Sequence, residues 1–375
     1  MSKKRILLLS VSAGAGHRRA AEAIRVSALQ NNEDLDVCHL DVMNFVTAGF
    51  RKIYTDFYIK LVNKAPTLWG YLYHATNEAQ SDSTMERLRR SVERLNSRPL
   101  LRAIADFAPD AIICTHFLPA EILSRLILKE RLYCPVWVQV TDFDLHRMWI
   151  HERMSGYFAA NDEIAQRMRL SGIAEHQIHV TGIPVMPAFT NHPLREECAT
   201  DIGLDPTKPT VLLMGGGAGL GGLDKVAGRL LALKVDFQLI VLAGNNAPAL
   251  KALQTMAPNF SGRLAALGFT DKVERLMACS DLVITKPGGL TTSECLAMGL
   301  PMIVNSPIPG QEERNADYLL EQGVALKAYD DLSLSYRLEF LLSHPEKLKA
   351  MRLAASALGK PYAARDVIEL VLENA

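Results

Sequence analysis

The sequence predicts an α/β protein built from two doubly wound domains that face each other across a cleft. Short apolar runs alternate with longer segments of helical periodicity, the pattern of βα units around a parallel sheet. Each half of the chain also carries a glycine-rich loop directly after its first apolar run. A length of 375 residues favours two domains over one.

Twelve apolar runs are the strand candidates. Six lie in the first half, at Ile6–Ser10, Val37–Asp41, Ala111–Thr115, Val136–Val140, Gly156–Ala159 and Gln177–Thr181. Six lie in the second half, at Thr210–Met214, Gln238–Leu242, Leu264–Leu267, Leu282–Thr285, Met302–Asn305 and Val324–Leu326. The stretch "TGIPVMPAFTNHP" between them has three prolines and little periodicity, so it reads as a linker. We therefore expect domains at 1–190 and 191–375, with a last helix able to pack back on the first domain.

Composition narrows the class of protein. Hydrophobic residues make up 49% of the chain and charged residues 22%, which is typical of a globular protein with large cores. The formal net charge is zero, which argues against a nucleic-acid partner. The six cysteines form no C-x-x-C pair, as expected for reduced thiols in the cytoplasm. No apolar stretch approaches the ~18 residues of a membrane-spanning helix, so we expect a protein that is soluble or lies on a membrane without crossing it.

The first glycine loop, "SAGAGHRR", does not fit the common nucleotide motifs. The third glycine of a dinucleotide fingerprint falls on Arg19, although Asp41 ends the second strand as that motif requires. A P-loop fails in both halves, because Lys-Ser or Lys-Thr follows neither loop. The glycines could simply make a tight turn. His17 could be a polar first-turn residue, or a base kept neutral by the helix dipole.

The second half contains "DLVITKPGGLTTSECLAMGLPMIVNSPIPGQEERNADYLLEQGVA", which predicts two helix N-termini near Thr291 and Gln311. Unpaired backbone N–H groups at such ends suit phosphate or sugar oxygens. Glu294 follows Thr291 by three residues, so it could complete a capping box or grip the hydroxyls of a ribose. Gln311 and Glu312 could be ordinary first-turn residues or acceptors for sugar hydroxyls.

These motifs resemble a known family. "ITKPGGLTTSE" and "PIPGQEERNA", with "GAGH" and "TDFDLHRMWIHE", are similar to the processive diacylglycerol glucosyltransferases and monogalactosyldiacylglycerol synthases of glycosyltransferase family 28. A more distant resemblance is to the N-acetylglucosaminyl transferase that acts on peptidoglycan lipid I. The resemblance spans residues 5–323 and implies two Rossmann-like domains of the GT-B type. It places the lipid acceptor on the first domain and a UDP-sugar on the second.

The resemblance also implies roles for individual residues on the donor side. Backbone amides at Gly288, Gly289, Leu290 and Thr291 would hold the diphosphate, Glu294 the ribose, and Gln311, Glu312 and Asn315 the sugar. Phe269 matches the position whose backbone reads uracil. The second glycine loop supplies Gly215, Gly216 and Gly217, the last standing where the lipid I transferase has a serine. No metal and no further cofactor is implied, because the helix N-termini replace the metal as counter-charge.

On the acceptor side, His17 matches the family histidine and would remove the proton of the acceptor hydroxyl. Asp142 in "VTDFDLH" is the reserve candidate for this base, and His146 is a further acceptor-side candidate. The alternative for this stretch is a helix cap followed by a solvated polar turn. His17 and Asp142 stay open as alternatives for the base.

A helical stripe that includes Phe50 and Phe57, followed by Trp69, lies beside basic residues in the sequence. Such a pattern fits an ordinary core-facing helix, or an interfacial helix on anionic lipid. Residues 1–190 also carry a slight excess of Lys and Arg. With a lipid acceptor, the second alternative predicts a cytoplasmic protein that is peripheral on the inner face of the cell membrane.

The sequence therefore predicts an inverting glycosyltransferase that moves glucose or galactose from UDP to diacylglycerol or a glycosyldiacylglycerol. The rival interpretations are a UDP-sugar epimerase or hydrolase, a transferase with a polyprenyl-linked acceptor, and a UDP-sugar sensor without activity. The choice of sugar, the number of sugars added and the oligomeric state stay open.

Overall fold

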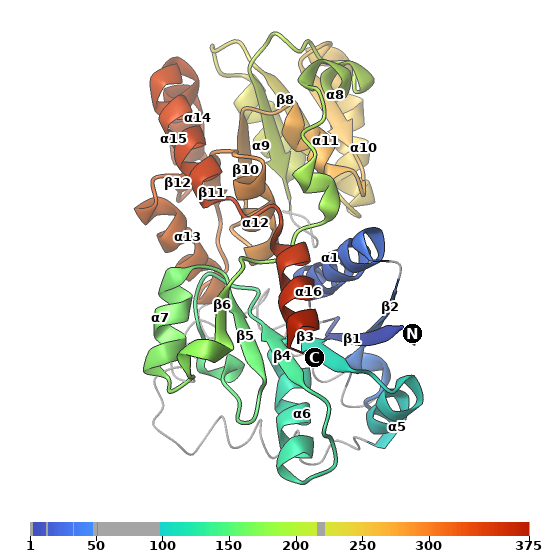
Figure 1. The fold of residues 1–375 in the computed structure, drawn as a ribbon. Coiled ribbons are helices and arrows are strands. Elements are labelled where there is room, and N and C mark those ends of the chain that lie inside the picture. The colour runs from blue at the N-terminus through green and yellow to red at the C-terminus, as the bar shows by residue number, and fades with distance from the viewer. Residues whose placement is uncertain are drawn as a thin grey trace. The chain divides into compact units, whose positions relative to one another are not determined.

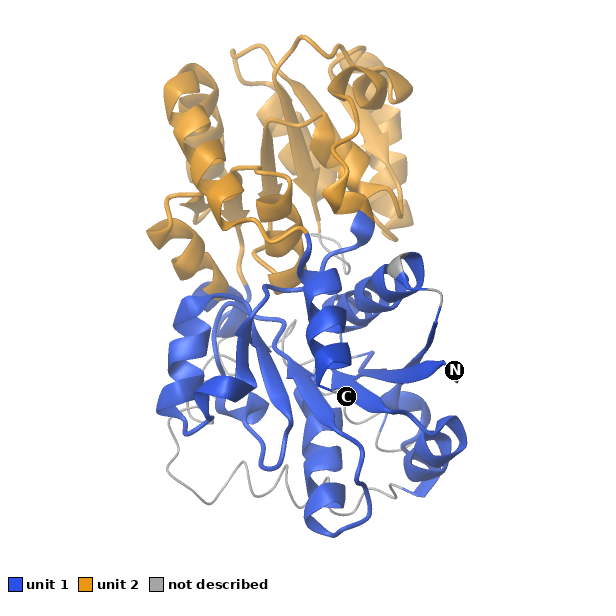
Figure 2. Ribbon diagram, viewed as in Figure 1, with its two compact units in different colours: residues 1–187, 308–314, 362–375 blue, residues 188–307, 315–361 orange. Residues whose placement is uncertain are grey.

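The computed structural model describes residues 3–12, 14–32, 34–47, 51, 98–215 and 222–374. The chain divides into two compact units, drawn in Figure 2. Unit 1 comprises residues 1–187, 308–314 and 362–375, and unit 2 comprises 188–307 and 315–361. The chain therefore crosses between the units several times rather than once.

Unit 1 is built on a parallel sheet of order β2-β1-β3-β4-β5-β6 (Figure 1). Its strands are β1 (Lys4–Ser10), β2 (Leu35–Asp41), β3 (Ala111–Cys114), β4 (Val136–Gln139), β5 (Gly156–Ala159) and β6 (Ile178–Val180). Its helices are α1 (Ala15–Asn31), α5 (Arg98–Phe107), α6 (Phe117–Leu128), α7 (Asp162–Leu170) and α16 (Ala363–Glu373), with short 3₁₀ turns η1 (Val42–Asn44), η2 (Arg147–Trp149) and η3 (Glu175–Gln177).

The core of unit 1 is apolar on both sheet faces, as a parallel sheet covered by helices requires. Ile6 to Leu9 are all fully buried on β1. One face packs Ile6 and Leu8 against Ile24 of α1 and Val367 of α16. The C-terminal helix α16 thus belongs to unit 1, where it packs against α1.

Unit 2 holds a second parallel sheet, of order β12-β11-β10-β7-β8-β9. Its strands are β7 (Thr210–Met214), β8 (Gln238–Leu242), β9 (Leu264–Leu267), β10 (Leu282–Thr285), β11 (Met302–Asn305) and β12 (Ala325–Ala328). Its helices are α8 (Arg195–Asp201), α9 (Leu223–Leu231), α10 (Ala247–Met256), α11 (Val273–Ala278), α12 (Gly289–Ala297), α14 (Asp331–Ser343) and α15 (Pro345–Leu358), with the 3₁₀ turn η5 (Ala257–Phe260). Two elements span the boundary, η4 (Pro187–Thr190) and α13 (Gln311–Glu321), whose residues 311–314 belong to unit 1.

The strand orders locate a switch point in each sheet. In unit 2 the chain moves outward from β7 to β9 and then returns to β10 on the other side of β7. In unit 1 the chain goes from β1 to β2 and returns to β3 on the other side of β1. Ligands of doubly wound sheets bind beyond the carboxyl ends of the strands at such points. The loops after β1 and β3, and after β7 and β10, are therefore where each unit is expected to hold a ligand.

The predicted fold class, with two doubly wound α/β domains, is confirmed. Each of the twelve predicted strands is present, with ends that shift by a few residues at most.

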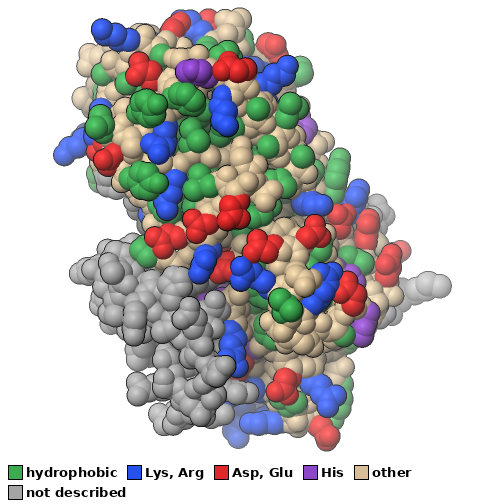
Figure 3. Space-filling model, turned by 90° about the vertical axis from the view of Figure 1, so that its left-hand side faces the viewer, with side chains coloured by type: hydrophobic (Ala, Val, Ile, Leu, Met, Phe, Trp, Pro, Cys, Tyr) green, Lys and Arg blue, Asp and Glu red, His purple; other side chains and the backbone are tan. Residues whose placement is uncertain are grey.

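The face of unit 2 that carries α14 and α15 mixes hydrophobic side chains with Lys, Arg, Asp and Glu (Figure 3). Among the described residues, no helix combines the length and the apolar character needed to cross a bilayer.

Candidate active site

His17 lies where three neighbouring strands of unit 1 end. It is the third residue of α1, which follows β1, and its half-buried ring contacts the residues that follow β3 and β4. Its Nδ1 is 3.0 Å from the backbone carbonyl oxygen of Thr115 and 2.8 Å from Oγ1 of Thr141. The switch point of the sheet thus brings His17 together with two residues that the sequence analysis did not single out.

Burial lowers the pKa of His17 to about 4, although the Thr115 carbonyl acts in the opposite direction. At neutral pH the imidazole is therefore uncharged, as the helix N-terminus also favours. Among the described residues, nothing hydrogen-bonds its other nitrogen, Nε2. A neutral ring with one nitrogen held and the other available is chemically a proton acceptor.

Two aromatic rings lie beside the His17 imidazole. The ring of His116 meets His17 edge-on with centroids 4.5 Å apart, and the Trp149 ring lies 6.2 Å away. His116 is buried, and its Nδ1 accepts the Leu118 N–H at the start of α6. Burial and the neighbouring His17 hold the pKa of His116 well below its usual range. Both imidazoles are therefore neutral at pH 7, and they do not repel each other.

Asp142 lies directly after Thr141 and is the third titratable group of the site. Its side chain is buried, and burial raises its pKa to about 7. The nearby carboxylates of Asp144 and Glu312 raise this pKa further, whereas hydrogen bonds from the Gln311 amide and the Trp149 indole lower it. At neutral pH Asp142 is therefore a carboxyl group poised between its two protonation states.

The bond from Gln311 to Asp142 joins two motifs that are 169 residues apart in the chain. Gln311 opens α13 within the "PGQEE" motif, and both residues belong to unit 1. The next residue, Glu312, accepts the backbone N–H of Ile308 at 2.7 Å, so one of its oxygens binds the loop that leads into the helix. Two predicted sugar contacts and the reserve base thus come together, which sequence spacing alone could not show.

The predicted solvated turn at "DFDLH" is wrong. Asp142, Asp144 and His146 are all buried. Nδ1 of His146 accepts the Met148 N–H at 3.2 Å and caps the 3₁₀ turn η2, which carries Trp149. The capping half of that alternative is therefore correct for His146, while its place among acceptor-side residues stays a prediction.

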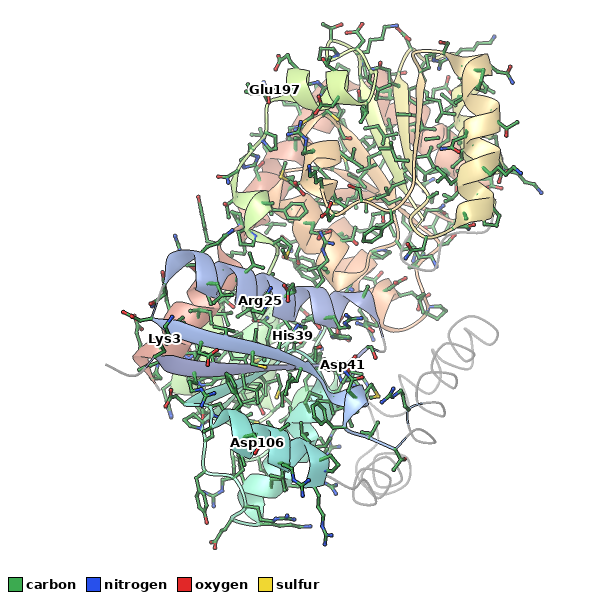
Figure 4. The ribbon with its side chains drawn as sticks, turned by 90° about the vertical axis from the view of Figure 1, so that its right-hand side faces the viewer. Lys3, Arg25, His39, Asp41, Asp106 and Glu197 are labelled. Atoms are coloured by element: carbon green, nitrogen blue, oxygen red, sulfur yellow. The ribbon has the colours of Figure 1, made fainter. Side chains whose placement is uncertain are left out.

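The apparent dinucleotide acid Asp41 has a structural task. Its Oδ1 accepts the backbone N–H groups of Ser12 and Met43, so it ties the first glycine loop to the end of β2. His39 lies nearby on β2 (Figure 4). Its Nε2 is 2.8 Å from Ser10 Oγ, and its Nδ1 is 3.5 Å from a Glu22 oxygen. This set resembles a hydrolytic triad, but Ser10 is fully buried and its hydroxyl cannot meet a substrate.

In unit 2, the K-P-G-G turn leads from β10 into α12. The helix begins at Gly289, and its N-cap, Gly288, makes no side-chain capping bond. The N–H groups of Gly289, Leu290 and Thr291 precede the first helical bond, from Thr292 N to Gly288 O. Donors at the positive end of a helix suit an anion such as a diphosphate.

Glu294 lies one turn further along α12 and is buried. The alternative that it forms a capping box with Thr291 is wrong, because the helix begins two residues before Thr291. Asn315 is fully buried and donates its side-chain amide to the Pro287 carbonyl at 2.9 Å. Asn315 therefore supports the turn that leads into α12.

The other predicted donor residues are placed only in part. Gly215 is buried directly after β7, and Phe269 is 69% exposed shortly after β9, where an aromatic ring is open to stacking. Gly216 and Gly217 lie outside the described residues, as do Phe50, Phe57 and Trp69. Within the described ranges, no group of three or more His, Cys, Asp or Glu residues is arranged to hold a metal ion.

Comparisons with known proteins define the class. Residues 210–367 match the glycosyltransferase family 28 C-terminal domain, and residues 17–185 match the family model described as monogalactosyldiacylglycerol (MGDG) synthase. The chain is therefore a glycosyltransferase. The predicted resemblance to the diacylglycerol glycosyltransferases is confirmed, since the first model matches most of the first half of the chain and the second most of the second half.

Named relatives agree with this class. The chain is 26% identical over 376 residues to a processive diacylglycerol beta-glucosyltransferase of Bacillus pumilus, covering 100% of this chain and 96% of the relative. It is 29% identical over 384 residues to monogalactosyldiacylglycerol synthase 3 of Arabidopsis thaliana, covering 98% of this chain and 80% of the relative. These two relatives carry different sugars in their names, so the likeness leaves the sugar open.

Solved structures support the fold. The MurG protein of Acinetobacter baumannii aligns with a TM-score of 0.62 at 14% identity, over 99% of both chains. A UDP-GlcNAc 2-epimerase from Neisseria meningitidis aligns with a TM-score of 0.60 at 14% identity, over 99% of this chain and 100% of the other. At such identities the likeness concerns the fold alone. Function must then come from the site.

Proposed function

We propose that the protein transfers a hexose from a UDP-sugar to diacylglycerol or a glycosyldiacylglycerol, with inversion at the anomeric carbon. The observation that carries the proposal is the group formed by His17, Asp142 and Gln311 in unit 1. It joins a neutral imidazole, a poised carboxyl group and the first residue of the sugar-binding motif. A sugar transferase needs a proton acceptor, and it needs polar groups that orient the sugar beside that acceptor.

The donor nucleotide is assigned to unit 2. Its diphosphate would lie at the N-terminus of α12, on the N–H groups of Gly289, Leu290 and Thr291. The helix dipole would provide the counter-charge for the leaving UDP, so the proposal needs no metal. Glu294 would accept hydrogen bonds from the ribose, and the exposed Phe269 would adjoin the uracil.

The reaction follows from these assignments. The acceptor hydroxyl oxygen attacks the anomeric carbon, while the bond from that carbon to the UDP oxygen breaks on the opposite face. The electron pair of the breaking bond leaves with UDP. Attack on the face opposite the leaving group inverts the configuration of the anomeric carbon. Nε2 of His17 takes the hydroxyl proton, a role worth typically about 10²–10⁴-fold in rate.

His17 fits the role of base better than Asp142 because of its access. Nε2 of His17 has no hydrogen-bond partner among the described residues, whereas Asp142 already accepts bonds from Gln311 and Trp149. The lowered pKa keeps the His17 lone pair available throughout the neutral range. Asp142 would then orient Gln311, and through it the sugar.

A diacylglycerol acceptor lies in a membrane, so the protein must contact a lipid surface to reach it. The aromatic and basic stretch that includes Phe50, Phe57 and Trp69 would lie on an anionic membrane, where apolar burial and charge attraction act together. Replacing these three residues by serine should then reduce sedimentation with anionic vesicles. An unfolded triple variant would instead place the stretch in a core. The proposal locates the protein on the inner face of the cell membrane.

Incubation of the purified protein with labelled UDP-glucose or UDP-galactose and diacylglycerol vesicles tests the function. The proposal predicts a labelled glycolipid whose anomeric configuration is opposite to that of the donor. A free sugar or an epimerised nucleotide sugar would instead favour the hydrolase or epimerase alternative, which the epimerase-like fold makes a fair rival. Product formed with a polyprenyl phosphate but not with diacylglycerol would show that the acceptor is a polyprenyl-linked lipid.

A further inference from the structure

The side chain of Thr141 contacts Nδ1 of His17, whereas the proposed proton acceptor is the other ring nitrogen, Nε2. We propose that Thr141 is a positioning residue which, together with the Thr115 carbonyl, holds His17 with its proton on Nδ1 and its lone pair on Nε2. The catalytic consequence rests on the proposed function, whereas the protonation pattern of the ring can be measured without it.

The Thr115 contact decides where the ring proton lies. A backbone carbonyl oxygen only accepts hydrogen bonds, so a bond of 3.0 Å to Nδ1 requires a proton on Nδ1. With the proton there, the Thr141 hydroxyl 2.8 Å away accepts a share of the same N–H. The opposite arrangement, with a bare Nδ1, would place two lone pairs against each other at the carbonyl.

Backbone contacts fix this arrangement in place. The hydroxyl of Thr115 donates to the His17 carbonyl at 2.8 Å, so Thr115 grips both the main chain and the ring of His17. Thr115 is fully buried and Thr141 is 5% exposed, so solvent does not compete for these bonds. The titratable groups around the ring are His116, which faces its edge, and Asp142, which follows Thr141.

This support differs from that of a base paired with a carboxylate. A carboxylate on Nδ1 stabilises the imidazolium by charge, as in serine hydrolases. Here two neutral oxygens accept the Nδ1 proton, which orients the ring but stabilises its charged form only through hydrogen bonds. Loss of the Thr141 hydroxyl should therefore affect the step in which Nε2 takes a proton more than it affects substrate binding.

Nitrogen NMR on protein labelled with [¹⁵N]histidine tests the protonation pattern. The His17 ring is assigned by the signals that disappear in His17→Gln. At pH 7.5 the proposal predicts a protonated Nδ1 and a bare Nε2. A ring protonated on Nε2 would overturn the proposal, whether or not the protein proves to be a transferase.

Kinetics test the role of Thr141. Thr141→Val keeps the shape of the side chain but removes its hydroxyl, and it should lower kcat by about 10- to 100-fold, as for a bond to a charged group, with KM for both substrates unchanged. Thr141→Ser restores the hydroxyl and should recover most of kcat. Should Thr141→Val fail to fold, Thr141→Ala is compared with Thr141→Ser in the same assay.

The matched control is Thr210→Val, because Thr210 is a fully buried threonine at the start of β7 in unit 2. It should leave kcat unchanged. Full activity in Thr141→Val, or equal loss in Thr141→Ser and Thr141→Val, would contradict a positioning role for the hydroxyl. Absence of transfer in the wild-type protein would count against the proposed function alone, because the NMR result stands apart from it.

Discussion

The His17 group of unit 1 and the α12 turn of unit 2 are built in different ways, although both lie at the switch point of a doubly wound sheet. In unit 1, side chains that follow β1, β3 and β4 hold one another, and burial shifts the pKa of His17 down and that of Asp142 up. In unit 2, the turn offers backbone N–H groups at a glycine N-cap. The first arrangement has the chemistry to accept a proton, and the second has the donors to bind an anion.

The largest effect is expected at His17, the proposed base. His17→Ala should lower the transfer rate by about 10²–10⁴-fold, because the hydroxyl loses its proton acceptor. Calorimetry should show unchanged UDP binding, since the α12 turn is untouched. A comparable loss of UDP affinity in this variant would break the division of labour between the two sites.

The next largest effect is expected at Glu294, the proposed ribose contact. Glu294→Ala should weaken UDP binding by about 1–3 kcal/mol, the range for a lost hydrogen bond to a charged group. The melting temperature should change little, because Glu294 does not cap α12. Unchanged UDP affinity together with a lower melting temperature would make Glu294 a structural residue.

An effect on stability, with a pH signature, is expected at Asp142. Its pKa is raised from 3.8 to about 7 in the folded protein, so the native state holds this proton more tightly than the unfolded chain does. The contribution of Asp142 to stability therefore falls as the pH rises from 3.8 to about 7, and it is constant above that window.

Asp142→Asn cannot ionise, so it should raise the free energy of unfolding by up to about 4 kcal/mol at pH 8, and by less than half of that at pH 5. Urea titrations at the two pH values measure the difference. An equal effect at both pH values would mean that burial does not oppose the charge of Asp142.

The smallest effect is expected at Gly14, the N-cap of α1. Its backbone is extended, with φ of 163°, and a Cβ there would meet His17 Cδ2 at an ordinary 3.9 Å. Gly14→Ala should therefore change stability by only about 0.5 kcal/mol. A loss of several kcal/mol in thermal denaturation would show that the first glycine loop depends on its glycine for conformation.

The fold was predictable because its signals are local. Runs such as Leu282–Ile284 are apolar throughout, as is typical of strands buried on both faces, and glycine or proline turns follow them. The ends of β6 and β12 were less predictable, because short edge strands carry few residues to mark them.

The site was predictable in its residues more than in its contacts. Sequence motifs marked His17, Asp142 and Gln311, but the bond between the last two crosses 169 residues and depends on tertiary structure. Thr115 was missed because it belongs to no recognisable motif. Trp149 lies in the "TDFDLHRMWIHE" motif, but its place beside His17 depends on tertiary structure. One signal was available for the threonines, since Thr115 and Thr141 both stand just beyond the end of a strand beside the switch point.

The most direct test of the central claim compares single-turnover rates of glycolipid formation in His17→Ala and Asp142→Asn between pH 5 and pH 9. If His17 is the base, His17→Ala is slow at every pH. Asp142→Asn then keeps substantial activity. Its rate does not fall as the pH is lowered through 7, because the pKa of His17 is about 4. Near-normal turnover in His17→Ala, with activity abolished in Asp142→Asn, would contradict the account and give the role of base to Asp142.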